Sequence, residues 1–191
     1  MPNWCFTKYV LEGNEQETKA LYELMKELEA KEKPAVPNGF GTTWLGCLVN
    51  ALGGEWESIR CRGTWEYIEL ENGILNITTD TAWAPCNETF DFICKKFQSL
   101  RYYYQAEEPG LELYTTNDAD GDFFLDRYLV DIHAPDGEFY HEYFENLTEA
   151  YEWIEETFDC SVKSEDDVKS LHKRWDKECD GYCYVHEFVI E

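Results

Sequence analysis

The sequence predicts an α+β fold whose first part is a ferredoxin-like split βαβ (βαββαβ) arrangement, an antiparallel sheet with two helices on one face. Two observations predict this fold. Segments rich in β-branched and aromatic residues alternate with segments of helical periodicity in the order strand, helix, strand, strand, helix, strand. Apolar residues make up 43% of the 191 residues and aromatic residues 16%, which is enough to form a packed core.

The first strand and helix follow from residue type and spacing. Residues 4–11 are rich in β-formers and end at Gly13. Asn14 is placed to cap a helix, and Glu17 is placed to complete a capping box with it. Four apolar residues then recur at the i, i+3, i+4, i+7 spacing of one buried helical face: Leu21, Leu24, Met25 and Leu28.

A hairpin, a second helix and a further strand complete the first part. Residues 64–70 and 74–81 flank an Asn-Gly pair, the strongest short-range signal for a hairpin. Asn87 is placed to cap the helix, and residues 101–106 read as the last strand. The buried face of this helix repeats the helical spacing: Phe90, Ile93, Cys94 and Phe97.

The later part of the chain alternates further strands with two helices. The helices are expected at residues 147–158 and 165–178, the second capped by Ser164. The expected strands lie at four places: residues 111–115, 123–133, 138–144 and 182–190. The expected organisation is therefore a ferredoxin-like core at 1–110 and an acidic, β-rich and helical extension at 111–191, packed on the same sheet as one compact unit.

Net charge and termini exclude several classes of partner. Forty acids against sixteen bases give a formal charge of −24, which repels the phosphates of nucleic acids and of anionic lipids. We therefore expect no direct nucleic-acid binding and no membrane, and a basic protein surface as the partner. The chain starts with no signal-peptide pattern and contains no run of about 18 apolar residues, so a cytoplasmic location with reduced thiols is expected. The eight cysteines are then ordinary buried residues, and no cofactor is indicated.

The negative charge is concentrated in the second half of the sequence. Residues 1–105 hold fifteen acids and ten bases, whereas residues 106–191 hold twenty-five acids and six bases. Like charges at helical spacing cost about 0.2–0.5 kcal/mol per pair, which invites a functional reason for them. The alternative interpretation is a solvated acidic face that only aids solubility. Five carboxylates on the polar face of the helix at 147–158 are the predicted binding residues: Glu149, Glu152, Glu155, Glu156 and Asp159.

Two residue sets imitate metal sites. The first consists of His172, Cys179, Cys183 and His186, but strand alternation puts the last two on opposite faces of a strand. The second, at residues 116–122, imitates a calcium loop but lacks its first ligand and its bidentate glutamate. Ordinary strand and turn roles explain both sets better, so no metal is expected.

No catalytic group is evident. His133 and His141 are candidate bases, yet no local motif places a nucleophile beside either of them. Ordinary surface histidines are the preferred interpretation, and no catalytic residue is assigned.

An ordered set of motifs resembles a known family. The motifs are Pro-Asn-Trp-Cys at 2–5, Gly-Thr-Thr-Trp at 41–44, Thr-Ala-Trp-Ala-Pro at 81–85, and Tyr-Tyr-Tyr at 102–104 before Glu-Pro-Gly at 108–110. Together, over residues 1–125, they resemble the YubB-type ferredoxin-like domain family, although Cys86 stands where its members commonly have a second proline. The resemblance implies a ferredoxin-like fold and carriage on phages, plasmids or other bacterial mobile elements. It implies no established activity.

The predicted function is that of a non-enzymatic, acidic protein-binding module. Two alternatives remain open. One is a DNA-mimic inhibitor of a nucleic-acid-binding host protein, since carboxylates at helical spacing present a field similar to that of a phosphate backbone. The other is a small enzyme with an unrecognised site, which would require histidine, cysteine and acidic side chains to converge in a pocket.

Overall fold

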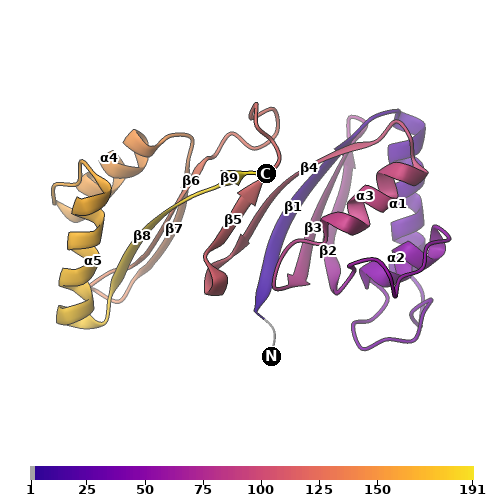
Figure 1. The fold of residues 1–191 in the computed structure, drawn as a ribbon, viewed down its shortest axis with the longest axis horizontal. Helices are drawn as coiled ribbons and strands as arrows, with labels where there is room; N and C mark the ends of the chain where they lie inside the picture. Colours follow the sequence, from indigo (N-terminus) through magenta and orange to yellow (C-terminus); the bar gives the residue numbers. More distant parts are fainter. Residues whose placement is uncertain (1–2) are drawn as a thin grey trace. The chain divides into compact units, whose positions relative to one another are not determined.

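The structure is a computed structural model that describes residues 3–191, apart from the side chain of Cys179. Backbone contacts divide the chain into two compact units, the first ending at Asn117 and the second beginning at Asp118. Both units combine strands with helices (Figure 1), so the predicted α+β class is confirmed.

The first unit contains five strands and three α-helices among its described residues. In chain order they are β1 (Trp4–Glu12), α1 (Glu15–Glu29), α2 (Leu45–Ala51), β2 (Gly63–Glu71), β3 (Ile74–Ala82), α3 (Asn87–Lys96), β4 (Arg101–Glu108), the 3-10 turn η1 (Pro109–Leu111) and β5 (Leu113–Thr116). Within this unit the strand order is β2-β3-β1-β4-β5, and each of these pairings is antiparallel. Figure 1 shows α1, α2 and α3 on one face of the sheet.

The predicted hairpin between β2 and β3 is confirmed. Asn72 and Gly73 both have positive φ values, 51° and 81°, as the tight turn between the strands requires. The register of β2 shifts by one residue between Trp65 and Tyr67, so Glu66 lies in a β-bulge on this edge strand.

The core of the first unit lies between the sheet and its helices. Leu21, Met25 and Leu28 of α1 are buried as the spacing predicted, and they pack with the inward residues of β1 and β3. Tyr9 of β1 stacks on Phe90 of α3 with a centroid distance of 3.6 Å.

The two helix caps predicted in the first unit, at Asn14 and Asn87, differ from the structure in their hydrogen-bond partners. Asn14 caps α1, and its side chain accepts a hydrogen bond from Gln16 N. The Glu17 carboxylate instead accepts hydrogen bonds from the backbone N–H and the hydroxyl of Ser99, at 2.9 and 2.6 Å. The capping box is therefore absent at this helix. Asn87 is the first residue of α3 rather than its cap, because its side chain accepts a 2.9 Å hydrogen bond from the buried Tyr9 hydroxyl. In both places a distant partner competes successfully with the local backbone.

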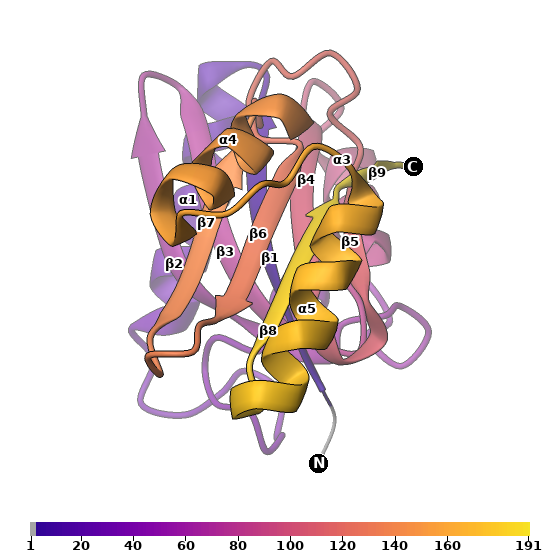
Figure 2. The ribbon, with the colours of Figure 1, turned by 90° about the vertical axis from the view of Figure 1, so that its left-hand side faces the viewer.

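The second unit is smaller and has its own core. Its elements are β6 (Tyr128–His133), β7 (Phe139–Phe144), α4 (Leu147–Phe158), α5 (Glu165–Cys179), β8 (Tyr182–Glu187) and β9 (Val189–Ile190). The sheet order is β7-β6-β8, with both pairings antiparallel. Figure 2 shows α4 and α5 over the same face of this sheet. Buried side chains from β6 and both helices meet there: Val130, Ile132, Ala150, Ile154, Val168, Leu171 and Trp175.

Two expectations for the later part of the chain differ from the structure. Residues 113–116 were expected in the extension, but as β5 they pair with β4 and belong to the first unit. A strand was expected over 123–133, but β6 begins only at Tyr128. The reason is Asp118, whose buried carboxylate accepts the backbone N–H groups of Asp122, Phe123 and Phe124 at 2.7–3.0 Å. Those N–H groups are therefore not available to a strand ladder.

We expect Asp118→Ala to destabilise the second unit by about 2–4 kcal/mol, because one buried and two part-buried N–H groups lose a charged acceptor. Burial acts to raise the pKa of Asp118, but the three N–H donors outweigh it and lower the pKa below its usual value. The stabilisation is therefore complete above the ordinary aspartate pKa of about 3.9 and is lost as the pH falls through the lowered pKa. Hydrogen exchange of residues 122–124 measures the effect, and Asp120→Ala, at an exposed site in the same turn, is the matched control. Equal protection in the two variants would contradict the assignment.

Candidate interaction surface

Helix α4 presents the predicted binding residues. The helix begins after Asn146, whose side chain accepts from Glu149 N at 3.0 Å, and it ends at Asp159, which adopts a left-handed conformation with φ 45°. Ala150 and Ile154 bury its apolar face against the sheet. The opposite face is consequently fixed toward solvent.

Three of the five predicted carboxylates share this outward face. Glu149, Glu152 and Glu156 are exposed and follow the i, i+3, i+7 spacing of one side of a helix. At a rise of about 1.5 Å per residue they are spaced roughly 4.5 and 6 Å apart along the helix axis. None of the three forms an ion pair with any residue that the structure describes. We call these three residues the acidic row.

The other two predicted carboxylates lie apart from the acidic row. Glu155 is only 18% exposed in its side chain, accepts a 2.8 Å hydrogen bond from Val162 N and binds the Lys163 ammonium. These contacts lower the pKa of Glu155, the Lys163 contact most of all. Glu155 therefore secures the connection between α4 and α5. Asp159 is exposed beyond the end of α4 and serves as its C-cap.

Helix α5 carries four bases beside five acids, and sequence reasoning overlooked this cluster of bases. Lys169 pairs with Glu165 at 2.6 Å, whereas Lys173, Arg174 and Lys177 have no ion pair among the described residues. The signal was present, since five of the six bases after residue 105 fall between Lys163 and Lys177. The net charge of residues 106–191 taken as a whole does not reveal this cluster of bases. The second unit therefore carries an acidic helix and a helix of mixed charge over one sheet.

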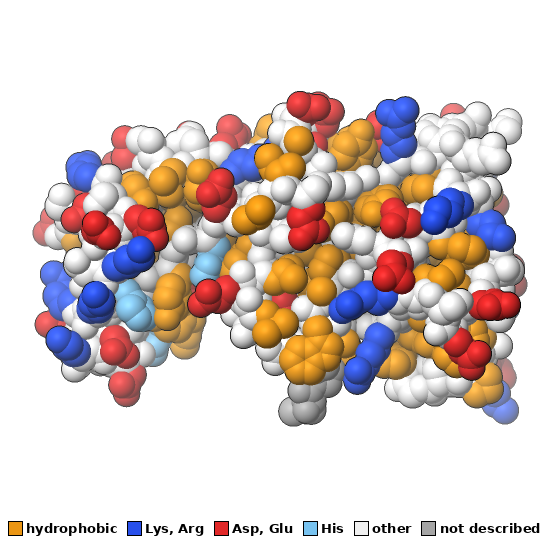
Figure 3. All heavy atoms as spheres, in the orientation of Figure 1, with side chains coloured by type: hydrophobic (Ala, Val, Ile, Leu, Met, Phe, Trp, Pro, Cys, Tyr) orange, Lys and Arg blue, Asp and Glu red, His pale blue; other side chains and the backbone are white. Residues whose placement is uncertain are grey.

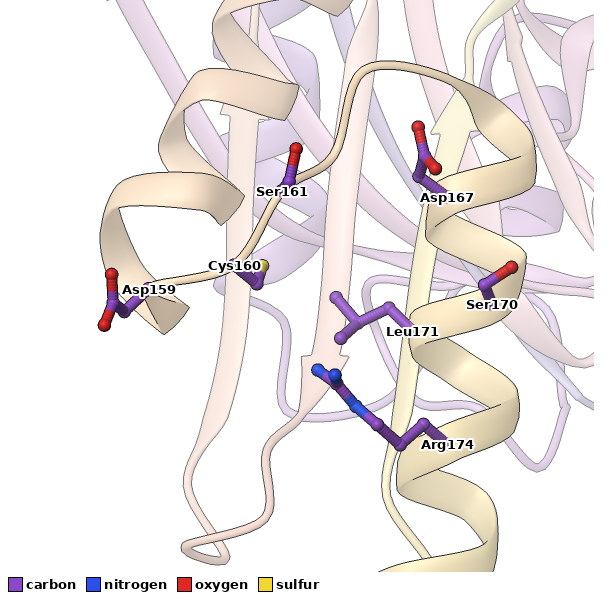
Figure 4. A pocket seen from close by; sticks show the side chains of 7 residues that line it. All are labelled: Asp159, Cys160, Ser161, Asp167, Ser170, Leu171 and Arg174. Carbon is purple, nitrogen blue, oxygen red and sulfur yellow. The ribbon is translucent and has the colours of Figure 1, made fainter.

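A shallow hollow of about 440 Å³ lies between the end of α4 and α5 (Figure 4). Its lining consists of Asp159, Cys160, Ser161, Asp167, Ser170, Leu171 and Arg174. Figure 4 shows Arg174 extending from α5 toward the 159–161 segment. The Asp167 carboxylate is already engaged, because it accepts from Lys163 N and from the Ser164 hydroxyl. No histidine lines the hollow, and burial raises the pKa of its one thiol, Cys160. The hollow offers no nucleophile paired with a base.

The four histidines lie among aromatic rings and backbone groups of the second unit. His133 stacks on Phe139 with a centroid distance of 4.3 Å, and the His141 Nε2 lies 3.1 Å from the Tyr143 hydroxyl. His172 Nδ1 accepts from Cys183 N at 3.4 Å, and the His186 ring lies 5.7 Å from that of Tyr184. None of these contacts pairs a histidine with a thiol or an aliphatic hydroxyl.

Neither imitation of a metal site forms a ligand set. Cys183 is buried in the helix-side core while His186 contacts Tyr184, and the side chain of Cys179 lies outside the described residues. In the 116–122 loop the Asp118 carboxylate is occupied by backbone N–H groups. Among the described residues no three His, Cys, Asp or Glu side chains are arranged to hold a metal ion.

The described cysteines are free thiols, and burial raises the pKa values of six of them: Cys5, Cys61, Cys86, Cys94, Cys160 and Cys183. The pKa rises to about 11 for Cys5, Cys61 and Cys94 and to about 12 for Cys86 and Cys183. At neutral pH these groups are protonated and therefore unreactive as nucleophiles.

Comparison with known proteins yields no matching family model, no matching curated protein and no matching solved structure. Across residues 3–191, none of the helices combines the length and the apolar character that a membrane crossing demands. The described surface thus defines the chain as an α+β protein with charged helical faces.

We expect the described thiols to react slowly with a disulfide reagent such as DTNB at pH 8 and rapidly in denaturant. Because thiolates are the reactive species, the native rate should increase as the pH rises toward 11. Cys94 and Cys160, which are only half-buried, should react first. Absorbance and peptide mapping follow the labelling, and fast stoichiometric labelling of the native protein at pH 8 would contradict this expectation.

Glu155→Gln should lower the thermal unfolding midpoint, because it removes the charge that Lys163 and Val162 N contact. Glu152→Gln removes like-charge repulsion together with a weak electrostatic attraction to Lys163, and it should leave the midpoint nearly unchanged. Since the Glu155 pKa is lowered, the Glu155 contribution is present above the ordinary glutamate pKa and is lost as the pH falls through the lowered value. Thermal unfolding at neutral and acidic pH compares the variants, and equal midpoints throughout would show that Glu155 has no structural role.

Proposed function

We propose that this protein is a non-enzymatic binding module that docks a basic protein surface through the acidic row of α4. The observation that supports the proposal is the shared outward orientation of Glu149, Glu152 and Glu156, which are exposed and lack ion pairs among the described residues. Three adjacent carboxylates repel one another by about 0.2–0.5 kcal/mol per pair. A partner rich in lysine and arginine would relieve that repulsion.

The acidic row should act mainly by raising the rate at which the two proteins associate. Complementary charge steers two proteins together and raises the association rate, whereas exposed ion pairs add little to the final affinity. The effect is screened beyond about 8 Å at physiological ionic strength, so the interaction should depend strongly on salt. A DNA-mimic mode is the narrower form of this proposal, in which the basic partner surface is a nucleic-acid-binding site.

We propose in addition that the first unit is a ferredoxin-like domain of the YubB type. The strand order supports this, because β3 lies between β1 and β2 while β1 lies between β3 and β4, so each helical crossover spans one strand. Carriage on a bacterial mobile element rests on the sequence resemblance, whereas a cytoplasmic location does not. Both remain proposals.

The triple variant Glu149→Gln, Glu152→Gln and Glu156→Gln should reduce partner capture and lower the association rate roughly tenfold at low salt. Affinity capture from a bacterial lysate at low and high salt, followed by binding kinetics on the captured protein, measures both effects. The salt dependence of the association rate should flatten in the triple variant. Competition with duplex DNA for the captured partner separates the DNA-mimic mode from general acidic docking.

A charge-matched control separates the acidic row from net charge. Glu32, Glu55 and Glu57 are exposed in the first unit and form no ion pair among the described residues. Changing these three to glutamine alters the net charge by the same amount. The proposal is wrong if both triple variants capture the same proteins at the same rate as the unmodified chain.

A further inference from the structure

Two exposed tryptophans lie at one end of the sheet in the first unit. Trp4 at the start of β1 is 47% exposed, and Trp83 just after β3 is 42% exposed. Their backbones are adjacent, because Trp4 pairs with Ala82 in the ladder and Trp83 N donates to Asn3 O at 3.0 Å. Large aromatic side chains usually bury most of their surface, so two exposed neighbours indicate a surface with a use.

Trp83 is held in a backbone conformation that a bulky residue rarely adopts. Its φ is +74°, in the left-handed region, which is unfavourable for a residue with a bulky side chain. Contacts on both sides fix it there. Ala82 N donates to Arg62 O at 2.9 Å, and the Thr81 hydroxyl donates to Ala84 O at 2.9 Å. Strain of this kind clusters at functional sites and persists where surrounding contacts impose it.

Two arginines flank the strained residue. Arg60 and Arg62 are both exposed, and neither forms an ion pair within the described part of the chain. The Arg60 guanidinium donates to Ala82 O at 2.9 Å, which places it directly beside Trp83. The nearby Glu88 carboxylate accepts from the Arg60 backbone N–H. Lys173, Arg174 and Lys177 also lack an ion pair among the described residues, so Arg60 and Arg62 are distinguished by their position near the exposed tryptophans.

The space-filling view agrees with this arrangement. In Figure 3, which has the orientation of Figure 1, apolar and Lys/Arg side chains lie side by side near the start of β1. Tryptophan and arginine are the residue types most enriched at the energetic centres of protein interfaces, where lysine and the acids are depleted.

We propose that Trp4, Trp83, Arg60 and Arg62 form a second docking surface, which binds an acidic segment of a partner protein that also presents apolar or aromatic side chains. The guanidinium groups pair with carboxylates while the indole rings cover the apolar side chains. The surface is separate from the acidic row. It selects an acidic partner, whereas the acidic row selects a basic one. Single-stranded nucleic acid also combines stacking with cation contacts, and the oligothymidylate arm of the test distinguishes it from an acidic segment.

Trp83→Gly separates binding from folding. Glycine relieves the left-handed strain, so the thermal unfolding midpoint should stay the same or rise. Binding of a fluorescein-labelled random copolymer of Glu and Tyr, followed by fluorescence polarisation, should weaken roughly tenfold or more. Trp4→Ala should weaken it comparably, and Arg62→Ala should in addition reduce its salt dependence.

Matched controls lie elsewhere on the same unit. Tyr67→Ala removes an aromatic side chain that is 49% exposed on β2, and Arg101→Ala removes an exposed arginine at the start of β4. Both should bind the copolymer like the unmodified chain. The proposal is overturned if the unmodified chain fails to bind the copolymer, if the control variants lose binding equally, or if oligothymidylate binds more tightly than the copolymer.

Discussion

One-sided burial is the constraint on which both units depend. Each sheet places helices over one face, and the apolar side chains of strand and helix meet in that layer. Once the apolar face of a helix is packed on the sheet, the residues on its opposite face point outward. The acidic row of α4 and the cations of α5 are consequences of this geometry, because Ile154 and Leu171 fix how each helix is rotated.

Periodic features were predictable from the sequence, whereas features that depend on distant partners were not. The spacing of Leu21, Met25 and Leu28 gave the buried face of α1, and the Asn-Gly pair gave the β2–β3 hairpin. Glu17 and Asn87 had the right type and position for local capping, yet each binds a side chain far away in sequence. Local rules rank residue types for a cap but contain no information about a competing tertiary partner.

The candidate surfaces show the same division. The outward positions of Glu149, Glu152 and Glu156 follow from helical spacing, but the diversion of Glu155 to Lys163 depends on how the chain turns after α4. The motif at residues 81–85 includes Trp83, but nothing in it predicts the left-handed conformation, because a bulky side chain rarely adopts it. Sequence patterns describe what is typical, and a strained residue is atypical by definition.

The bulge on β2 limits how any partner can approach the sheet of the first unit. Glu66 interrupts the register of this outer strand, the Thr64 hydroxyl donates to its carboxylate at 2.6 Å, and Glu69 and Glu71 are exposed further along. A strand from another molecule would meet an irregular ladder lined with like charges, which disfavours both strand addition and edge-to-edge aggregation. Recognition on this side of the domain is therefore left to side chains rather than to the main chain.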